Sequence, residues 1–310
     1  MYYFIINPNS RSGAGKKVWT DLRQILQTKN ISYEEHFTEY AGHAIELSRR
    51  ISSSAREQHP VTIIAVGGDG TIQEVLTGLK NPAFIRFGYI PTGSRNDFCR
   101  STGLSHDPKE ALMTVLNSDQ TLSLNIAELT CQNSTSRFAV SCGIGFDAAV
   151  CHEIGISPIK MFMNRFGLGK LAYLLIGVKQ LFALPPVSLS VETDAGDMLT
   201  FKQVFLTAIM NMKYEGGGFQ FCPFADPSDH LLDVIVMEGM RRPKLILCLF
   251  LSLFGKHTRF KGVHLLHSGS SQRRRICRIS DRFFSFSCKR KPAAHHSQMR
   301  LQVFTFLILN

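Results

Sequence analysis

The sequence predicts an α/β domain with a parallel sheet, followed by a mainly antiparallel β-sandwich domain. Over roughly the first hundred residues, strand-like apolar runs alternate with segments of helical periodicity, which is typical of a parallel sheet covered on both faces. Further along, strand-like runs are separated by short polar breaks, and this pattern favours antiparallel pairing. With 310 residues and 44% hydrophobic residues, the chain can bury two cores of ordinary size.

The first domain is predicted to span residues 1–122. Its strands and helices are expected, in alternation, at Tyr2–Ile6, Val18–Leu26, Ser32–Phe37, Gly42–Ile51, Val61–Val66, Ile72–Leu79 and Phe84–Ile90. A basic, glycine-containing turn at Arg11 to Lys17 follows the first strand. Its spacing fits neither a P-loop nor the GxGxxG fingerprint, so taken alone it is as readily structural as ligand-binding.

The stretch GGDGT lies between a buried strand and a helix. Bare glycine backbone and the N–H groups of a helix start can approach a polyanion together at such a place. Sheets of this kind bind their ligands at the carboxyl ends of the strands, where this stretch falls. Phosphate is therefore the expected ligand of Gly67, Gly68, Asp69, Gly70 and Thr71.

A second loop of small and polar residues, PTGSRNDF at Pro91 to Phe98, follows the next strand. It carries Asp97, as GGDGT carries Asp69. Two carboxylates on neighbouring loops beside a phosphate would be poorly tolerated unless a divalent cation bridged them to it, so together they imply Mg²⁺. The alternative is that Asp97 caps the helix expected from Phe98 onward.

The second domain is predicted to span residues 123–270. A basic helical pattern from Ile159 to Leu184 indicates either a helix that lies on anionic lipid or a helix packed on the sheet with solvated lysines. The apolar run Leu245–Phe254 also allows two interpretations, a core helix or the edge of a lipid pocket. Strands are expected at Leu122–Leu129, Phe138–Val140, Val187–Glu192, Thr200–Ile209 and Leu232–Met237.

Composition narrows the class of protein. The formal net charge is +11, but Ser271 to Asn310 holds nine Lys and Arg residues against one acid, so the rest of the chain is nearly balanced and nucleic acid is not an expected partner. The eight cysteines show no CxxC pair and no regular spacing, which indicates reduced thiols in a cytoplasmic protein. No apolar run approaches the ~20 residues of a membrane-spanning helix.

Four motifs together resemble the diacylglycerol kinase catalytic-domain family, in particular its bacterial soluble lipid kinases. GGDGT alone is shared with NAD kinases and phosphofructokinases, whereas the combination is specific and covers roughly residues 1–269. The resemblance implies a Rossmann-like, ATP-binding domain of the NAD kinase and diacylglycerol kinase type, and a β-rich lipid-substrate domain. The motifs are INPNSRSGAGK at Ile6 to Lys16, GGDGT, PTGSRNDF, and GGGFQFCPFADPSDHLLDV at Gly216 to Val234.

Carried over to this sequence, the resemblance implies a nucleotide site on several loops. Ser94 stands where the family usually has Thr, so a hydroxyl is retained. Besides the GGDGT residues, the site is expected to include Asn7, Ser10, Gly13, Thr38, Ser94, Asn96 and Asp97.

The resemblance also implies a structural Mg²⁺ site between Pro223 and Asp233. The family has Asp-Gly-Leu there, and this chain has Asp229-His230-Leu231. Asp229 is the expected ligand, aided by the carbonyl oxygens of Asp226 and Leu231, because Mg²⁺ prefers oxygen donors. The change from Gly to His puts in doubt any geometry that needs a positive φ at position 230.

The motif that carries the catalytic base in this family is absent from this sequence. In the family it is the Asp of an Asp-Gly-Glu triplet that follows a segment like Val263 to Ser270, and no such triplet occurs after Ser270. Asp281 lies near the expected place and is a weak candidate, since Arg282 and Phe283 follow it. Residues 271–298 form an atypical basic segment without either periodicity, and only residues 299–310, expected to return to the first domain, contain another strand.

Three explanations of residues 271–298 stay open: a reading-frame disruption, a natural degenerate kinase, or a basic extension for membrane or nucleic acid. The sequence predicts an ATP- and Mg²⁺-dependent lipid kinase that phosphorylates a diacylglycerol-like hydroxyl, with its competence in question because the base motif is absent. It is expected in the cytoplasm or at the inner membrane face, and a homodimer is a further expectation. The alternatives are a sphingoid-base kinase, an NAD kinase, which the later motifs disfavour, and a non-catalytic nucleotide- and lipid-binding protein.

Overall fold

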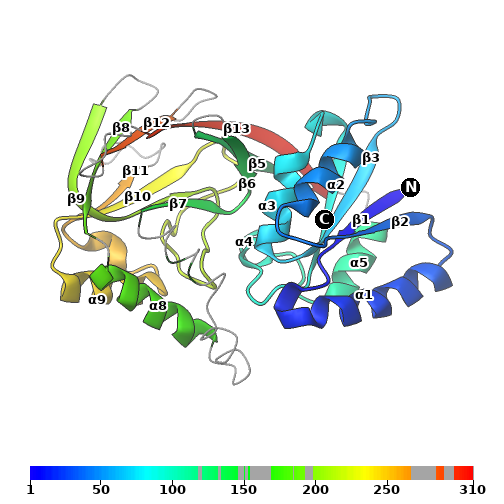
Figure 1. Ribbon diagram of the computed structural model, residues 1–310, viewed down its shortest axis with the longest axis horizontal. Coiled ribbons are helices and arrows are strands. Elements are labelled where there is room, and N and C mark those ends of the chain that lie inside the picture. Colours follow the sequence, from blue (N-terminus) through cyan, green and yellow to red (C-terminus); the bar gives the residue numbers. More distant parts are fainter. Residues whose placement is uncertain are drawn as a thin grey trace. The chain divides into compact units, whose positions relative to one another are not determined.

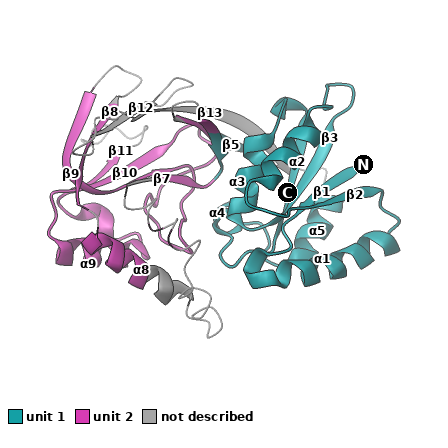
Figure 2. Ribbon diagram, in the orientation of Figure 1, with its two compact units in different colours: residues 1–126, 136–139, 305–310 teal, residues 127–135, 140–304 magenta. Residues whose placement is uncertain are grey.

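The chain forms two compact units, coloured separately in Figure 2. Unit 1 contains residues Met1–Ile126, Ser136–Ala139 and Thr305–Asn310, and unit 2 contains Ala127–Thr135 and Val140–Phe304. Each unit has a hydrophobic core of its own. The computed structural model describes residues 1–117, 121–131, 134–145, 150, 153, 169–183, 185–192, 198–266, 284–289 and 297–309.

Unit 1 is a parallel sheet with helices on both faces (Figure 1). Four strands follow one another in the order β4-β3-β1-β2, with α1 and α5 packed on one face and α2 and α3 on the other. The elements are β1 (Tyr2–Ile6), α1 (Ser10–Thr28), β2 (Tyr33–Phe37), α2 (His43–Ser52), β3 (Val61–Gly67), α3 (Asp69–Gly78), η1 (Pro82–Phe84), β4 (Ile85–Pro91), α4 (Asp97–Thr102) and α5 (Pro108–Asn117).

The strand registers bring four loops to one edge of this sheet. Ile6 pairs with Phe37 on one side and with Val66 on the other, and Gly67 pairs with Pro91. The carboxyl ends of β1, β2, β3 and β4 are therefore level. Whatever binds at this edge can contact all four loops.

Trp19 provides a marker for the core of unit 1. Its side chain is only 2% exposed, and its ring lies 5.0 Å from that of Phe4 and 6.2 Å from that of Tyr33. The indole N–H donates a hydrogen bond to Glu35 at 2.7 Å. Because the sequence contains one tryptophan, its fluorescence reports on unit 1 alone.

Unit 2 is built on an antiparallel sheet. The order β11-β10-β9-β8-β12-β13 is complemented by β7, which pairs with β9, and α8 and α9 lie on the same face of the sheet (Figure 1). The remaining elements are β5 (Thr121–Cys131), β6 (Ser134–Phe138), β7 (Ser141–Gly145), α8 (Gly169–Ala183), β8 (Val187–Glu192), β9 (Met198–Met210), β10 (Asp233–Glu238), α9 (Arg242–Ser252), η2 (His257–Arg259), β11 (Val263–Leu266), β12 (Phe284–Lys289) and β13 (Ser297–Leu309).

The predicted fold class is confirmed, a parallel α/β unit and an antiparallel unit. The last strand, β13, begins in unit 2 and ends in unit 1, where Ile308 pairs with Phe87 of β4. The domain boundaries expected at residues 122 and 270 stay predictions. Among the described residues, no helix combines the length and the apolarity that crossing a bilayer requires.

Two predictions of secondary structure are wrong, one of a strand and one of a segment without regular structure. Residues Phe138–Val140 do not form a strand, because β6 ends at Phe138 and the carbonyl of Val140 instead accepts the N–H groups of Asn211 and Met212 at 2.9 and 3.1 Å. Residues 271–298, expected without regular structure, contain β12, whose alternation of Phe and Ser is a period-two signal that the prediction missed. Of the helix expected at Ile159–Leu184, residues 169–183 form α8, and residues 159–168 lie outside the described residues.

Candidate functional site

Hydrogen bonds between distant residues join the loops at the carboxyl edge of unit 1. The hydroxyls of Ser10 and Thr92 lie 2.7 Å apart and are buried, so the loop after β1 is tied to the loop after β4. Asn7 donates from Nδ2 to Thr71 Oγ1 at 3.2 Å, which ties the first loop to GGDGT as well. The three loops therefore form one connected structure.

Two glycines of this edge are required by packing. A Cβ on Gly67 would stand 2.2 Å from Thr71 Oγ1, and a Cβ on Gly93 would stand 2.7 Å from the Cα of Gly68. The carbonyl of Gly67 also accepts the N–H groups of Thr92 and Gly93 at 2.8 and 3.1 Å. The GGDGT loop and the loop after β4 thus touch backbone to backbone, where no side chain fits.

Gly70 is different, because nothing in the fold requires a glycine there. A Cβ at this position would meet nothing within 4 Å, and its φ does not lie in the left-handed region. It lies in the first turn of α3, where glycine is about 1 kcal/mol less favourable than alanine. The open space in front of Gly70 is the kind of opening that a ligand approaching the backbone would fill.

The turn after β1 adopts an unusual backbone. Arg11, Ser12 and Gly13 all have left-handed φ values, of 50°, 58° and 94°, so regular helix in α1 begins only after Gly13. Gly13 faces open space, as Gly70 does, whereas a Cβ on Gly15 would stand 2.3 Å from Ser10 Oγ. Two consecutive non-glycine residues in this region are strained, and such strain is characteristic of functional loops.

Asp69 is held by the start of α4. Its two carboxylate oxygens accept the N–H groups of Asp97 and Phe98, both at 3.1 Å. The alternative role of Asp97 as the cap of this helix is therefore wrong: Asp97 is the first helical residue, and the capping carboxylate comes from Asp69, 28 residues earlier. Sequence patterns find caps next to the helix, and this one is distant.

The negative charge of Asp69 affects the pKa values of neighbouring side chains. Burial, followed by the Asp69 carboxylate, raises the pKa of the Tyr89 hydroxyl well above its usual value and that of the Cys99 thiol to about 12. Asp97, itself only 3% exposed, adds to the effect on Tyr89. The two carboxylates therefore share one poorly solvated neighbourhood.

These two carboxylates fit the donor set of a nucleotide-bound Mg²⁺. Such an ion takes one or two protein carboxylates and completes its shell with phosphate and water. Asp69 would use its remaining lone pairs, since each of its oxygens already accepts one N–H. Within the part of the chain that the structure describes, no three His, Cys, Asp or Glu side chains gather into a metal cage, so phosphate and water would have to supply the rest.

The other predicted nucleotide-site residues lie at the same edge. Thr38 is buried at the end of β2, where its N–H donates to Ile6 at 2.8 Å. The side-chain oxygen of Asn96 lies 3.0 Å from the Tyr89 hydroxyl, and its amide donates to Gly93 at 3.3 Å. Ser94 is exposed, so its hydroxyl faces solvent.

The predicted metal site of unit 2 is a cluster of carboxylates. Asp226 Oδ1 accepts the N–H and the hydroxyl of Ser228 at 2.9 and 2.6 Å, and Asp229 Oδ1 accepts the N–H of Leu231 at 2.9 Å. Burial, and then the charge of Asp226, raises the pKa of Asp229 against the lowering effect of the Leu231 bond. A cation at this loop would relieve the repulsion.

Asp233, at the start of β10, belongs to the same cluster and was not among the predicted ligands. Burial, followed by the charges of Asp229 and Asp226, raises its pKa to about 7. The charge of Asp226 thus acts on Asp229 and both act on Asp233, but the three carboxylates do not converge closely enough to enclose one ion by themselves. Carbonyl oxygens and water would have to complete a Mg²⁺ shell, as the expected roles of Asp226 and Leu231 imply.

His230 keeps the backbone conformation that the glycine of the family would allow. Its φ is 62°, in the left-handed region. The replacement of Gly by His therefore leaves the turn in place at an energetic cost of about 1 kcal/mol. The acidic loop thus accommodates His230 in the backbone conformation that the sequence alone had put in doubt.

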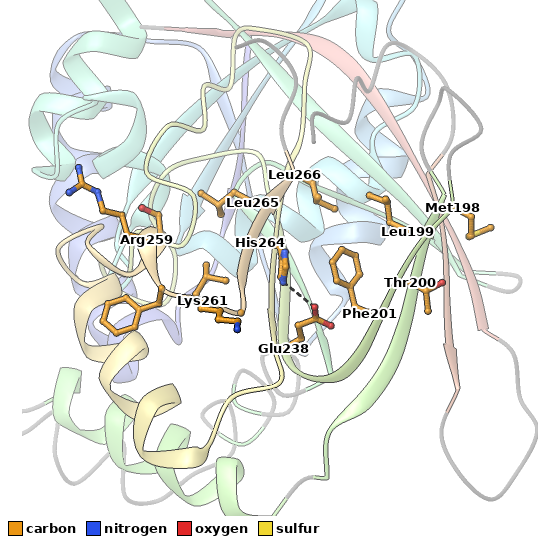
Figure 3. A pocket seen from close by; sticks show the side chains of 14 residues that line it. Met198, Leu199, Thr200, Phe201, Glu238, Arg259, Lys261, His264, Leu265 and Leu266 are labelled. Atoms are coloured by element: carbon orange, nitrogen blue, oxygen red, sulfur yellow. Dashed lines mark ion pairs between the residues drawn. The ribbon is translucent and has the colours of Figure 1, made fainter. Parts of the chain in front are cut away.

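Unit 2 also contains a pocket of about 680 Å³, shown in Figure 3. Its central polar contact joins His264 Nε2 to Glu238 at 3.0 Å, and the ring of Phe201 lies 5.3 Å from the imidazole. The second oxygen of Glu238 accepts the N–H of Lys202 at 2.9 Å. The apolar part of the wall includes Met198, Leu199, Leu265 and Leu266. A pocket of this size and lining can accept an apolar chain.

Sequence reasoning missed Thr92, Tyr89 and Asp233. Thr92 lies inside the PTGSRNDF motif, so its place in the motif was the available signal, whereas the contacts of Tyr89 and Asp233 depend on residues elsewhere in the chain. Asp281, the weak candidate for the base, lies outside the described residues.

Comparison with family models assigns both halves of the chain. Residues 1–128 match the model described as "Diacylglycerol kinase catalytic domain", and residues 141–274 match the "YegS C-terminal NAD kinase beta sandwich-like domain". The chain is thus similar to the diacylglycerol kinase catalytic domain over its first 128 residues, and the two matches together cover most of its length. Both matches agree with the structure, the first with the loops at the carboxyl edge of unit 1 and the second with the antiparallel sheet of unit 2.

Individual relatives extend the match over most of the chain. YtlR of Bacillus subtilis (strain 168), which is named as a lipid kinase, is 29% identical over 265 residues, or 84% of this chain and 85% of that protein. A diacylglycerol kinase of the same organism is 29% identical over 257 residues, or 82% and 78%. The crystal structure of a diacylglycerol kinase from Bacillus anthracis strain Sterne matches with a TM-score of 0.68 over 99% of this chain and 96% of that one, and at 18% identity this likeness shows the fold.

Proposed function

We propose that this protein transfers the γ-phosphoryl group of ATP to the hydroxyl of a diacylglycerol-like lipid, with Mg²⁺ as the metal. The match of residues 1–128 to the diacylglycerol kinase catalytic domain supports the reaction, and the names of the relatives support a lipid acceptor. The apolar pocket of unit 2 is consistent with an acceptor that has acyl chains. We further propose a cytoplasmic protein that acts at the inner membrane face, and a homodimer stays a prediction.

The open space at Gly70 carries the nucleotide part of this proposal. The fold does not need a glycine there, yet glycine weakens the first turn of α3. The first N–H groups of any helix lack intrahelical partners and, with the helix dipole, favour a bound phosphate. A phosphate that contacts this turn accounts for the missing side chain.

The roles of the surrounding residues follow from their contacts. The N–H bonds to Asp69 keep its carboxylate in a fixed position, so that with Asp97 it can hold a metal ion that, when bound, neutralises phosphate charge. Asn7 and Ser10 position the GGDGT loop and the loop after β4 through their hydrogen bonds to Thr71 and Thr92. We assign no base among the described residues.

The test of the nucleotide site is Gly70→Ala, with ATP affinity measured by calorimetry in the presence of Mg²⁺. The added methyl occupies the space for phosphate, so affinity should fall roughly tenfold or more, while the Trp19 unfolding transition stays unchanged or rises by up to about 1 kcal/mol. Gln73→Ala, an exposed change on the same helix, is the control and should leave affinity unchanged. Unchanged ATP affinity in Gly70→Ala would contradict the proposal.

The second candidate is a nucleotide- and lipid-binding protein without transferase activity. The absence of an Asp-Gly-Glu triplet after Ser270 favours it. Transfer of labelled phosphate from ATP to diacylglycerol vesicles separates the two candidates. ATP binding that Asp69→Ala abolishes, without transfer to any lipid, supports the second, whereas no ATP binding rejects both.

A panel of acceptors tests the lipid. Vesicles with diacylglycerol should support transfer, and sphingoid bases should not. Preferential transfer to a sphingoid base would replace the proposed acceptor while leaving the nucleotide site intact.

A further inference from the structure

Helix α9 is apolar on the face that it exposes as well as on the face that it buries. Leu245, Cys248 and Leu249 pack into the core of unit 2. Leu247 and Phe250 are 47% and 48% exposed on another face. A surface helix of a globular protein ordinarily carries polar side chains there, so this second apolar face needs a partner.

Neighbouring segments extend this apolar face. Phe254, just past the end of α9, is 59% exposed, and its ring lies 5.8 Å from that of Phe250. Phe224 is 77% exposed on a loop that contacts the same helix end, since a Cβ on Gly255 would lie 3.1 Å from Pro223. The loop and the helix end thus present three phenylalanines.

Helix α8 adds to the surface from the other side. It lies beside α9 on the same face of the sheet (Figure 1), and its Phe182 is 60% exposed. The guanidinium of Arg242 lies 5.4 Å from the centre of the Phe182 ring and donates to Leu181 at 3.3 Å, which joins the two helices. Of the nine large apolar side chains exposed in the described residues, six lie on α8, on α9 or on the segments next to the end of α9, and we call them together the aromatic face: Leu175, Phe182, Phe224, Leu247, Phe250 and Phe254.

Cations border the aromatic face. Arg241, Arg242 and Lys244 surround the first turn of α9, which contains no acid, and Lys256 is exposed beyond its end. Positive charges at a helix N-terminus oppose the helix dipole and weaken the helix by a few tenths of a kcal/mol or more each. Their placement is therefore unfavourable for the helix alone and favours an anionic partner.

Most acidic side chains near α8 and α9 form ion pairs or hydrogen bonds. Glu153 pairs with Lys179 of α8, and Glu238 pairs with His264. Asp226, two residues after Phe224, accepts two hydrogen bonds from Ser228. The charge that borders α9 is thus mainly positive, whereas the Asp226 carboxylate keeps its negative charge beside the Phe224 loop.

We propose that the aromatic face docks on an anionic lipid bilayer, with Phe250 and Phe254 in the interface and Arg241 and Lys256 at the headgroups. Amphipathic surfaces with aromatic and basic residues bind bilayers in this way, through buried apolar area and attraction to anionic lipid. A second copy of the chain fits less well, because a symmetric contact would bring the bordering cations of the two copies together. The proposal does not depend on the proposed function, since it needs neither ATP nor transfer.

The experiment is co-sedimentation of the full chain, without nucleotide, with vesicles of phosphatidylglycerol and phosphatidylcholine in equal parts. Binding is expected, and the double variant Phe250→Gln with Phe254→Gln should weaken it roughly tenfold or more. Arg241→Glu with Lys256→Glu should weaken it as well and reduce its dependence on salt. Tyr40→Gln, which replaces a 54% exposed aromatic side chain of unit 1, is the matched control and should bind as the parent does.

Three results would overturn the proposal. One is the absence of binding to the mixed vesicles, and another is equal binding to pure phosphatidylcholine. The third is a dimer in sedimentation velocity that the Phe250→Gln and Phe254→Gln variant converts to a monomer, which would assign the face to a second copy. Because nucleotide is absent throughout, failure of docking and failure of phosphoryl transfer are measured separately.

Discussion

The carboxylates of the two acidic sites have opposite surroundings: one is hydrogen-bonded to backbone N–H groups, and the others lie near further negative charges. In unit 1, Asp69 receives two backbone N–H groups from the start of α4, so its charge is stabilised without any ligand. In unit 2, the charge of Asp226 raises the pKa of Asp229 after burial does, and the charges of Asp229 and Asp226 add to the effect of burial on the pKa of Asp233. Asp69 is therefore held in place in the free protein, whereas the carboxylates of the second site repel one another and a cation would relieve that repulsion.

The difference can be measured because the units can be observed separately. Trp19 fluorescence follows unit 1, and hydrogen exchange of the β9 amides follows unit 2. A single unfolding free energy would not be well defined for two units, so each prediction below refers to one of them.

The largest expected effect is that of Asp69→Ala. The N–H groups of Asp97 and Phe98 lose a charged acceptor, and unit 1 should lose about 3 kcal/mol of unfolding free energy in the Trp19 transition. Asp21→Ala, an exposed carboxylate on α1, is the control and should change it little. Equal effects of the two changes would mean that Asp69 has no special structural role.

Asp233→Asn should have the opposite sign. The folded-state pKa of Asp233 is raised to about 7, so its contribution to stability is full below the unfolded value of 3.8 and is lost as the pH rises through 7. The variant should stabilise unit 2 by about 2 kcal/mol at about pH 8 and by little at about pH 4, because Asn mimics the protonated acid.

The measurement is hydrogen exchange of β9 at the two pH values, with Trp19 fluorescence expected to stay unchanged. Millimolar Mg²⁺ should stabilise the parent at the higher pH, and Asp229→Asn should abolish that gain. A stabilisation independent of pH would show that the raised pKa is not its cause.

The burial of His257 should make unit 2 less stable as the pH falls, which is opposite to the effect of Asp233. Its Nε2 lies 3.0 Å from the carbonyl of Phe221, while Nδ1 is buried without a partner in the described structure, and burial lowers the pKa of the ring. Stability from this histidine is present above the unfolded pKa of 6.5 and is lost as the pH falls through the folded value. In the Asp233→Asn background, which removes the opposing trend, unit 2 should lose about 1 kcal/mol between pH 6.5 and 5. His257→Gln should flatten this slope.

The smallest effect is expected from His230→Gly. The left-handed φ of 62° suits glycine, so the acidic loop should gain about 0.5 to 1 kcal/mol, partly offset by the greater freedom of glycine in the unfolded chain. Exchange of the β10 amides would report the gain. Gly216→Ala, at another left-handed position of the same unit, is the reverse control and should lose stability.

Local patterns predicted much of the fold. The apolar runs of β1, β3 and β4 and the turns after them follow from residue order, because a strand of a doubly covered sheet must be apolar on both faces. The same patterns failed at Val140, which is bonded to the distant residues Asn211 and Met212, and at β12, which pairs with the distant strand β8.

The candidate site was predicted in its residues but not in its contacts. GGDGT and PTGSRNDF named Asp69, Asn96 and Asp97. Their partners could not be predicted, since the bond from Ser10 to Thr92 spans 82 positions and that from Asn7 to Thr71 spans 64.

The sequence by itself determined which residue types stand at the strand ends, and through them the family and the expected nucleotide chemistry. Only the tertiary structure decided that Gly67 and Gly93 serve packing while Gly70 faces open space, and that Asp69 holds α4. The physical reason is range: propensity and periodicity act between residues a few positions apart. The order and register of the strands bring together residues that no local signal relates.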